Sequence, residues 1–155
     1  MLDITVCIMS YNRSVFLREA LISVLSQTRL AKKVVIYDNG SDSNVYEEIK
    51  DFLDQGVEWV GADVNHPFIW NFYRALNASS SKYTLLLHDD DRLCENFLEA
   101  QVNLLTNNQA LVAVSCNGHL IDGNGKKTGG TLTPVVQDAM VEQYTCSGQV
   151  ALKFA

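Results

Sequence analysis

The chain lacks several features that would assign it to a broad class of protein. None of its apolar stretches reaches the roughly 18 uninterrupted residues that a membrane span needs. The first ten residues do not show the charged-then-apolar order of a signal peptide. No Lys/Arg stripe is present, and a net charge of −6 disfavours a nucleic-acid-binding surface. With 47% apolar and 19% charged residues, the composition is that of an ordinary globular domain.

Cysteine is sparse and scattered. Its four copies, Cys7, Cys94, Cys116 and Cys146, form no CxxC pair, which is poor evidence for zinc or for a disulfide framework. Because Cys7 and Cys116 fall in apolar, strand-like runs, we expect both to be small buried hydrophobes.

Strand-like and helix-like segments alternate along the chain. The patterns predict strands at 4–9, 33–37, 57–60, 83–88 and 111–115, and helices at 16–25, 45–53, 67–78 and 96–105. Such alternation predicts an α/β fold with a Rossmann-like, doubly wound, mostly parallel sheet flanked by helices. Residues 117–126 carry a hairpin signal, which we prefer to a calcium loop because Lys126 stands where an oxygen ligand would be needed.

Three polar loops follow predicted strands: Ser10–Ser14, Asp38–Asp42 and Asp89–Arg92. Ligands of doubly wound sheets bind at the carboxyl ends of the strands, so these loops predict a site. In the first loop, Tyr11 is suited to stack on a base, Ser10 and Asn12 to hydrogen-bond, and Arg13 to meet a phosphate. In the second, Asp38, followed by Asn39, is suited to accept a base N–H or a ribose hydroxyl. The alternative for Tyr11 is an aromatic that packs at the start of a helix. The alternative for Asp38 is a side chain that closes an Asx turn or caps a helix.

The third loop holds three adjacent carboxylates, Asp89, Asp90 and Asp91. Neighbouring acids repel unless a cation shares them, so the triplet is suited to a divalent metal that bridges a diphosphate. A solvated acidic turn is the alternative. The first loop contains no glycine, and neither G-x-G-x-x-G nor a Walker P-loop is present. Phosphates therefore need a different partner, which a metal on the triplet would supply.

Several segments, in order, resemble family 2 glycosyltransferases of the GT-A fold, over roughly residues 4–125. They are Ile4–Arg13, Leu25–Thr28, Val34–Asp42, Trp70–Leu76 and Leu86–Asp91, the last being similar to the family's D-x-D strand end. His88 stands where the family often has an acid, which leaves two alignments of the D-x-D pair open. Phe68 occupies a position where the family commonly has glycine.

The resemblance implies a sugar transferase that uses a nucleotide-diphosphate donor, a UDP-sugar first, with Mn²⁺ or Mg²⁺ and inversion at the sugar. It assigns nucleotide binding to Ser10, Tyr11, Asn12, Arg13, Asp38, Asn39 and Asp89, and the metal to Asp90, Asp91 and Asp89. The acceptor would be a saccharide or a lipid-linked hydroxyl, as in polysaccharide biosynthesis.

The sequence does not identify a residue as the catalytic base. In the family it lies beyond the D-x-D region, and Asp138 and Glu142, the acids in that direction, lack a matching context. We therefore expect one GT-A-like domain over 1–155, truncated at its C-terminus. Its core would be 1–116, and 117–155 would hold the hairpin and the start of the acceptor region.

The N-x-S sequons at Asn12 and Asn39 lie in two of the polar loops, where a glycan would block binding. This favours a cytoplasmic location. The cytoplasmic face of a membrane is included, if regions beyond this truncated chain attach the protein there.

Rival functions fit the loops less well. A nucleotidyltransferase needs a glycine-rich first loop, and a response regulator needs acids after the first strand. A glycosyltransferase-like module that binds without catalysis remains the alternative.

Overall fold

The computed structural model describes residues 1–132, 144–146 and 149–152. The chain divides into two compact units, residues 1–99 and 100–155, and each is described by itself. Asp138 and Glu142 lie outside the described residues. Within the described part of the chain, no helix is both long and apolar enough to span a membrane.

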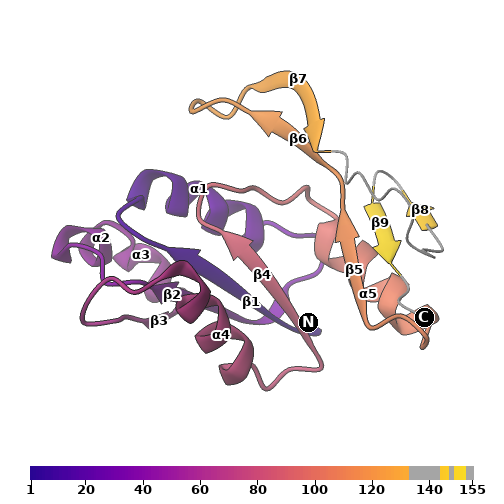
Figure 1. The fold of residues 1–155 in the computed structure, drawn as a ribbon, viewed down its shortest axis with the longest axis horizontal. Coiled ribbons are helices and arrows are strands. Elements are labelled where there is room, and N and C mark those ends of the chain that lie inside the picture. Colours follow the sequence, from indigo (N-terminus) through magenta and orange to yellow (C-terminus); the bar gives the residue numbers. More distant parts are fainter. Residues whose placement is uncertain (133–143, 147–148, 153–155) are drawn as a thin grey trace. The chain divides into compact units, whose positions relative to one another are not determined.

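The first unit is built on a four-stranded parallel sheet with the strand order β3-β2-β1-β4 (Figure 1). Its elements are β1 (Leu2–Ser10), α1 (Ser14–Leu25), β2 (Ala31–Asp38), α2 (Ser43–Glu48), α3 (Lys50–Leu53), β3 (Glu58–Val60), α4 (Phe68–Ala78) and β4 (Tyr83–His88). α5 (Phe97–Asn107) begins at the end of this unit. The strand order reverses direction between β3 and β4, so right-handed crossovers place α1 and α4 on opposite faces of the sheet. Figure 1 shows them there.

Both faces of the central strand β1 are buried, which explains why it reads as a continuous apolar run rather than an alternating one. On the α4 face, Cys7, Val35 and Tyr37 pack with Ala75. On the other face, Val6, Ile8 and Ile36 are fully buried, as are Leu17 and Leu21 of α1. The sequence pattern predicted this α/β arrangement, and the sheet confirms it.

Two predicted elements differ from the structure. The helix expected at 45–53 is two short helices, α2 and α3, because the backbone of Ile49 leaves helical geometry at φ −113°. The strand expected at 111–115 is β5 (Ala113–Cys116), and it pairs antiparallel with β9 (Gln149–Leu152) rather than extending the parallel sheet. β9 also pairs antiparallel with β8 (Tyr144–Cys146).

Cys116 is exposed, so the prediction that it is buried is wrong, whereas Cys7 is buried as expected. The apolar run that ends at Cys116 forms a short strand of an antiparallel sheet, and such sheets commonly leave one face to solvent. The hairpin prediction is confirmed by β6 (Gly118–Ile121) and β7 (Lys127–Leu132). Asp122 caps its turn by accepting the N–H groups of Asn124 and Lys126.

Candidate functional site

The three polar loops meet at one edge of the parallel sheet. Ser10, the last residue of β1, pairs in register with Asp38 of β2, and Met9 pairs with His88 of β4. The ladder continues past the strand ends, because the N–H of Asn39 donates to the Ser10 carbonyl at 2.9 Å. The loop after β1 therefore lies between the loops that follow β2 and β4.

Asp38 divides its two carboxylate oxygens between two roles. Oδ2 accepts the N–H groups of Gly40 and Ser41 at 3.0 and 2.9 Å, which is the Asx turn that the sequence left open. Oδ1 is buried and has no hydrogen-bond partner among the described residues, and the residue as a whole is only 3% exposed, so water has little access to it. A buried acceptor without a donor is costly, and its usual explanation is a ligand or an ordered water.

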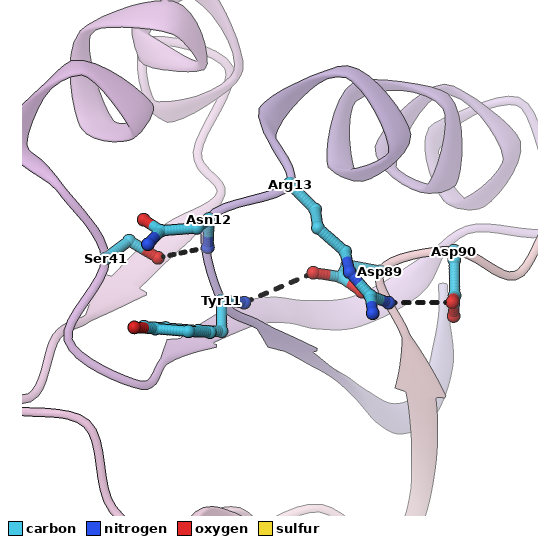
Figure 2. Close-up of polar contacts among 6 residues, drawn as sticks. All are labelled: Tyr11, Asn12, Arg13, Ser41, Asp89 and Asp90. Carbon is cyan, nitrogen blue, oxygen red and sulfur yellow. Dashed lines mark hydrogen bonds and ion pairs between the residues drawn. The ribbon is translucent and has the colours of Figure 1, made fainter.

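Asn12 joins the loop after β1 to the loop after β2 (Figure 2). Its N–H donates to the Ser41 hydroxyl, and its side-chain carbonyl accepts the N–H of Asp42, both at 2.8 Å. Asn12 has φ +52°, the left-handed region that asparagine tolerates better than most residues. The two bonds hold the loop in this conformation, in which the neighbouring residue Tyr11 is 42% exposed. A ring this exposed is available for stacking.

Asp89 is the buried member of the acidic triplet, at 4% exposure. Its Oδ2 accepts the backbone N–H of Tyr11 at 3.2 Å, which ties the loop after β4 to the loop after β1 (Figure 2). Burial raises the pKa of Asp89, whereas the Tyr11 N–H, the Ser10 hydroxyl and the Arg13 charge act in the lowering direction. The Ser10 hydroxyl lies near enough to act electrostatically, but it makes no hydrogen bond with good geometry within residues 1–132.

Asp90 and Asp91 are exposed and lie in a turn closed by a bond from the Asp91 N–H to the His88 carbonyl at 3.2 Å. Partial desolvation of the Asp91 carboxyl by nearby atoms, followed by the neighbouring Asp90 charge, raises the pKa of Asp91 although the residue as a whole is exposed, and His88 acts in the lowering direction. The His88 ring stacks on Phe68 of α4, with centroids 5.4 Å apart and planes 12° from parallel. His88 therefore has a packing partner at the start of α4.

Arg13 reaches from the start of α1 to the triplet. Its Nη1 lies 2.8 Å from Asp90 Oδ2 and 3.5 Å from Asp89 Oδ1 (Figure 2). Of the predicted site residues, Ser10, Tyr11, Arg13, Asp38 and Asp89 thus come together at one edge, with Asn12 and Asp90 joined to them by direct contacts.

Asn39 lies at the same edge, but its side chain is committed to the segment before α4. Nδ2 donates to Asn65 Oδ1 and to the His66 carbonyl, and Oδ1 accepts the His66 N–H. Any contact between Asn39 and a ligand would therefore be made by the Asn39 backbone. The role of Asn39 in nucleotide binding stays a prediction.

Three residues that hold the site in place were not singled out by the sequence. Gln27, buried at the end of α1, donates to the Cys94 carbonyl and accepts the Leu98 N–H, which fixes the segment after the triplet. Asn71 of α4 donates to the Tyr37 carbonyl at 2.7 Å, and Arg74 donates to the Asp38 carbonyl at 2.7 Å. Gln27 lies in Leu25–Thr28, and Asn71 and Arg74 lie in Trp70–Leu76, two of the segments that resemble the family, which is the one signal that pointed to all three.

Within the described ranges, no group of three or more His, Cys, Asp or Glu side chains is arranged to hold a metal ion. The triplet nevertheless offers hard carboxylate oxygens that already share one cation, the Arg13 guanidinium. Mg²⁺ is commonly bound through one or two carboxylates together with substrate phosphates and water. The residues fit a metal held in that way, and they do not form a cage made of protein alone.

The sequence matches the family described as "Glycosyl transferase family 2" over residues 5–146. The chain belongs to glycosyl transferase family 2. Its fold is the GT-A fold, a parallel sheet flanked by helices. No curated protein matches this family 2 chain.

Solved structures similar to this family 2 chain include S. aureus TarS, with 16% identity, a TM-score of 0.63, and coverage of 78% of this chain and 21% of that one. Another is the mannosyltransferase PcManGT from Pyrobaculum calidifontis in complex with GDP-Man and Mn²⁺, at 14% identity, TM-score 0.64, and 77% and 36% coverage. A third is S. aureus TarS 1–349 in complex with UDP-GlcNAc, at 16% identity, TM-score 0.60, and 78% and 34% coverage. This chain thus spans well under half of each protein.

Proposed function

We propose that this chain forms the donor-binding part of a glycosyltransferase that takes a sugar from a nucleotide diphosphate, a UDP-sugar first. The observation that carries the proposal is the Asp38 carboxylate, whose Oδ1 is buried and lacks a partner within residues 1–132. An imide N–H of a base or a ribose hydroxyl would supply the missing donor. Similar structures are complexes with UDP, UDP-GlcNAc and GDP-Man, which supports a nucleotide-sugar ligand.

The loops divide the ligand between them in this proposal. Tyr11 stacks on the base, and Asp38 accepts a hydrogen bond from the base or ribose. Asp89 helps to orient the ribose or diphosphate through the Tyr11 N–H that it holds at 3.2 Å. The Arg13 side chain, 52% exposed and paired with Asp90, is accessible to a phosphate.

Asp90, together with Asp91 and Asp89, would hold Mn²⁺ or Mg²⁺, in keeping with the Mn²⁺ in the complex of PcManGT. A bound metal supplies Lewis-acid stabilisation of the leaving diphosphate. The contribution of this chain is to hold the carboxylates at the sheet edge. Gln27 does so by fixing the segment that follows them.

The finer parts of the proposal concern the whole enzyme. In this proposal the acceptor is a saccharide or a lipid-linked hydroxyl, and transfer inverts the configuration at the anomeric carbon of the sugar. The protein works in the cytoplasm. The location rests on the sequons at Asn12 and Asn39, since both asparagines lie at the site edge, where a glycan would obstruct the ligand.

Titration calorimetry with UDP tests the proposal, with Mn²⁺ present and again in EDTA. We expect Mn²⁺ to tighten UDP binding, and Asp90→Ala to abolish that gain. Asp38→Asn should weaken binding about tenfold, because the amide can keep the Asx turn only by presenting an N–H where the ligand also has one. A UDP dissociation constant that changes neither on addition of Mn²⁺ nor in Asp38→Asn would refute the proposal. GDP and dTDP titrated in parallel determine the preferred base.

A further inference from the structure

One guanidinium nitrogen lies between two acids of the triplet. Arg13 Nη1 contacts Asp90 at 2.8 Å and Asp89 at 3.5 Å, and Figure 2 shows the side chain reaching from the start of α1 to the end of β4. The proposed function assigns a divalent metal to these same carboxylates. A guanidinium and a divalent metal held on one carboxylate lie only a few ångströms apart and repel each other, so the binding of either cation disfavours the other.

The other arginine next to the triplet is committed elsewhere. Arg92 pairs with Glu19 of α1. Arg13 is therefore the cation that the structure places on Asp90 and Asp89.

The backbone of Arg13 is fixed, whereas its side chain is not. Its carbonyl accepts the N–H of Leu17 in the first turn of α1, and the two preceding residues are held by Asp89 and Ser41. The Arg13 side chain is 52% exposed and that of Asp90 is 49% exposed. An ion pair this exposed contributes little to stability, so breaking it costs little. The guanidinium can thus leave Asp90 while the loop after β1 keeps its shape.

We propose that Arg13 is a resident cation that competes with the divalent metal for Asp90 and is released to the diphosphate when the donor binds. This inference rests on the proposed function and names the part that Arg13 plays in it. Metal alone has to bind against the repulsion of the guanidinium, or push it away from Asp90, and therefore binds weakly. Once a diphosphate is present, the displaced guanidinium gains a new anionic partner, so metal and nucleotide favour each other's binding.

The proposal predicts opposite effects of one substitution on two ligands. In Arg13→Gln, Mn²⁺ alone should bind more tightly than in the wild type, because no cation has to leave Asp90. UDP in EDTA should bind more weakly, because its phosphates lose a partner. A purely structural role for Arg13 would weaken both ligands or neither.

Arg18→Gln is the matched control. Arg18 lies on α1 and also pairs with an aspartate, Asp51, which is not part of the triplet. Both substitutions replace an arginine with glutamine, so the control removes the same net charge. The 155-residue chain is titrated with Mn²⁺ alone, with free Mn²⁺ followed by electron paramagnetic resonance, and then with UDP in EDTA by calorimetry. Circular dichroism confirms that each variant is folded.

We expect the Mn²⁺ dissociation constant of Arg13→Gln to be about threefold lower than that of Arg18→Gln, the range of an exposed ion pair, and its UDP dissociation constant to be higher. Arg13→Lys, which keeps a cation, should stay close to the wild type for Mn²⁺. If Arg13→Gln and Arg18→Gln bind Mn²⁺ equally while UDP and Mn²⁺ still bind the wild type, the competition is refuted and the proposed function stands. Absence of UDP and Mn²⁺ binding to the wild type would overturn both.

Discussion

The α-carbon of Gly40 lies directly against the backbone of Val64: a Cβ built on Gly40 would be 2.5 Å from the Val64 carbonyl carbon. Gly40 also has φ +81° and donates its N–H to Asp38, so the turn that holds Asp38 depends on the missing side chain. Neither the backbone conformation nor the close approach is compatible with a larger residue.

Gly40→Ala should therefore destabilise the protein by about 2–4 kcal/mol, from left-handed strain and from the collision with backbone atoms that have no free rotation. Gly56→Ala is the control, since Gly56 has φ +93° but no atom within 4 Å of the added methyl group. That variant should lose only about 1 kcal/mol, the strain alone. Urea unfolding measures both, and equal losses would mean that the contact with Val64 carries no cost.

Tyr11→Ala should weaken UDP binding by about 1–3 kcal/mol if the exposed ring stacks on the base. Tyr11→Phe keeps the ring and should bind UDP nearly as well as the wild type. Calorimetric dissociation constants for the two variants separate stacking from any role of the hydroxyl. An unchanged constant for Tyr11→Ala would remove the stacking role.

Gln27→Leu should lower the free energy of unfolding by about 2–4 kcal/mol, because it leaves the buried Leu98 N–H without an acceptor and removes the donor to the Cys94 carbonyl. Gln55→Leu is a fitting comparison, since Gln55 is exposed and makes one bond to a carbonyl of its own helix segment. Its effect should stay within about 0.5 kcal/mol. Chemical denaturation measures the free energy of unfolding of both variants. A loss of stability in Gln27→Leu as small as that in Gln55→Leu would contradict the anchoring role of Gln27.

Cys7 should be far less reactive than Cys94 in the folded protein. Burial raises the pKa of the Cys7 thiol to about 11, with a small opposing effect of Lys33, whereas Cys94 is exposed. At pH 8 the thiolate fraction of Cys7 alone predicts alkylation at least about 100-fold slower than that of an ordinary cysteine. Iodoacetamide labelling followed by peptide mapping tests this, with urea-unfolded protein as the reference. Early labelling of Cys7 would show that the strand opens.

The sequence predicted the parts of the fold that depend on local pattern. The strand predicted at 83–88 is β4, Tyr83–His88, because an apolar run bounded by Ser/Lys on one side and three acids on the other has clear limits. The strand ends also predicted which loops would meet, since Ser10 pairs with Asp38 in the parallel ladder. The break at Ile49 was missed because the apolar spacing of residues 45–53 continues through it.

Contacts between segments distant in sequence leave little trace in a single chain. Arg74 looks like a surface residue of an amphipathic helix, yet it caps carbonyls at the ends of two strands, Asp38 and Val60. The ion pair of Arg13 with Asp90 likewise joins positions that no periodicity relates. Asn12 carried a usable signal, because asparagine is enriched at positive φ, but its bonds to Ser41 and Asp42 depend on the strand order.

The strand order has a consequence for how the protein is made. β1 leaves the ribosome before β2 and β4 and can pair with β2 early, but its other edge stays open until Tyr83–His88 has been synthesised. A strand that waits for a distant partner presents unpaired amide groups to other nascent chains. Folding at the ribosome is therefore most vulnerable in the interval before β4 emerges, and slow translation of that stretch would lengthen the exposure.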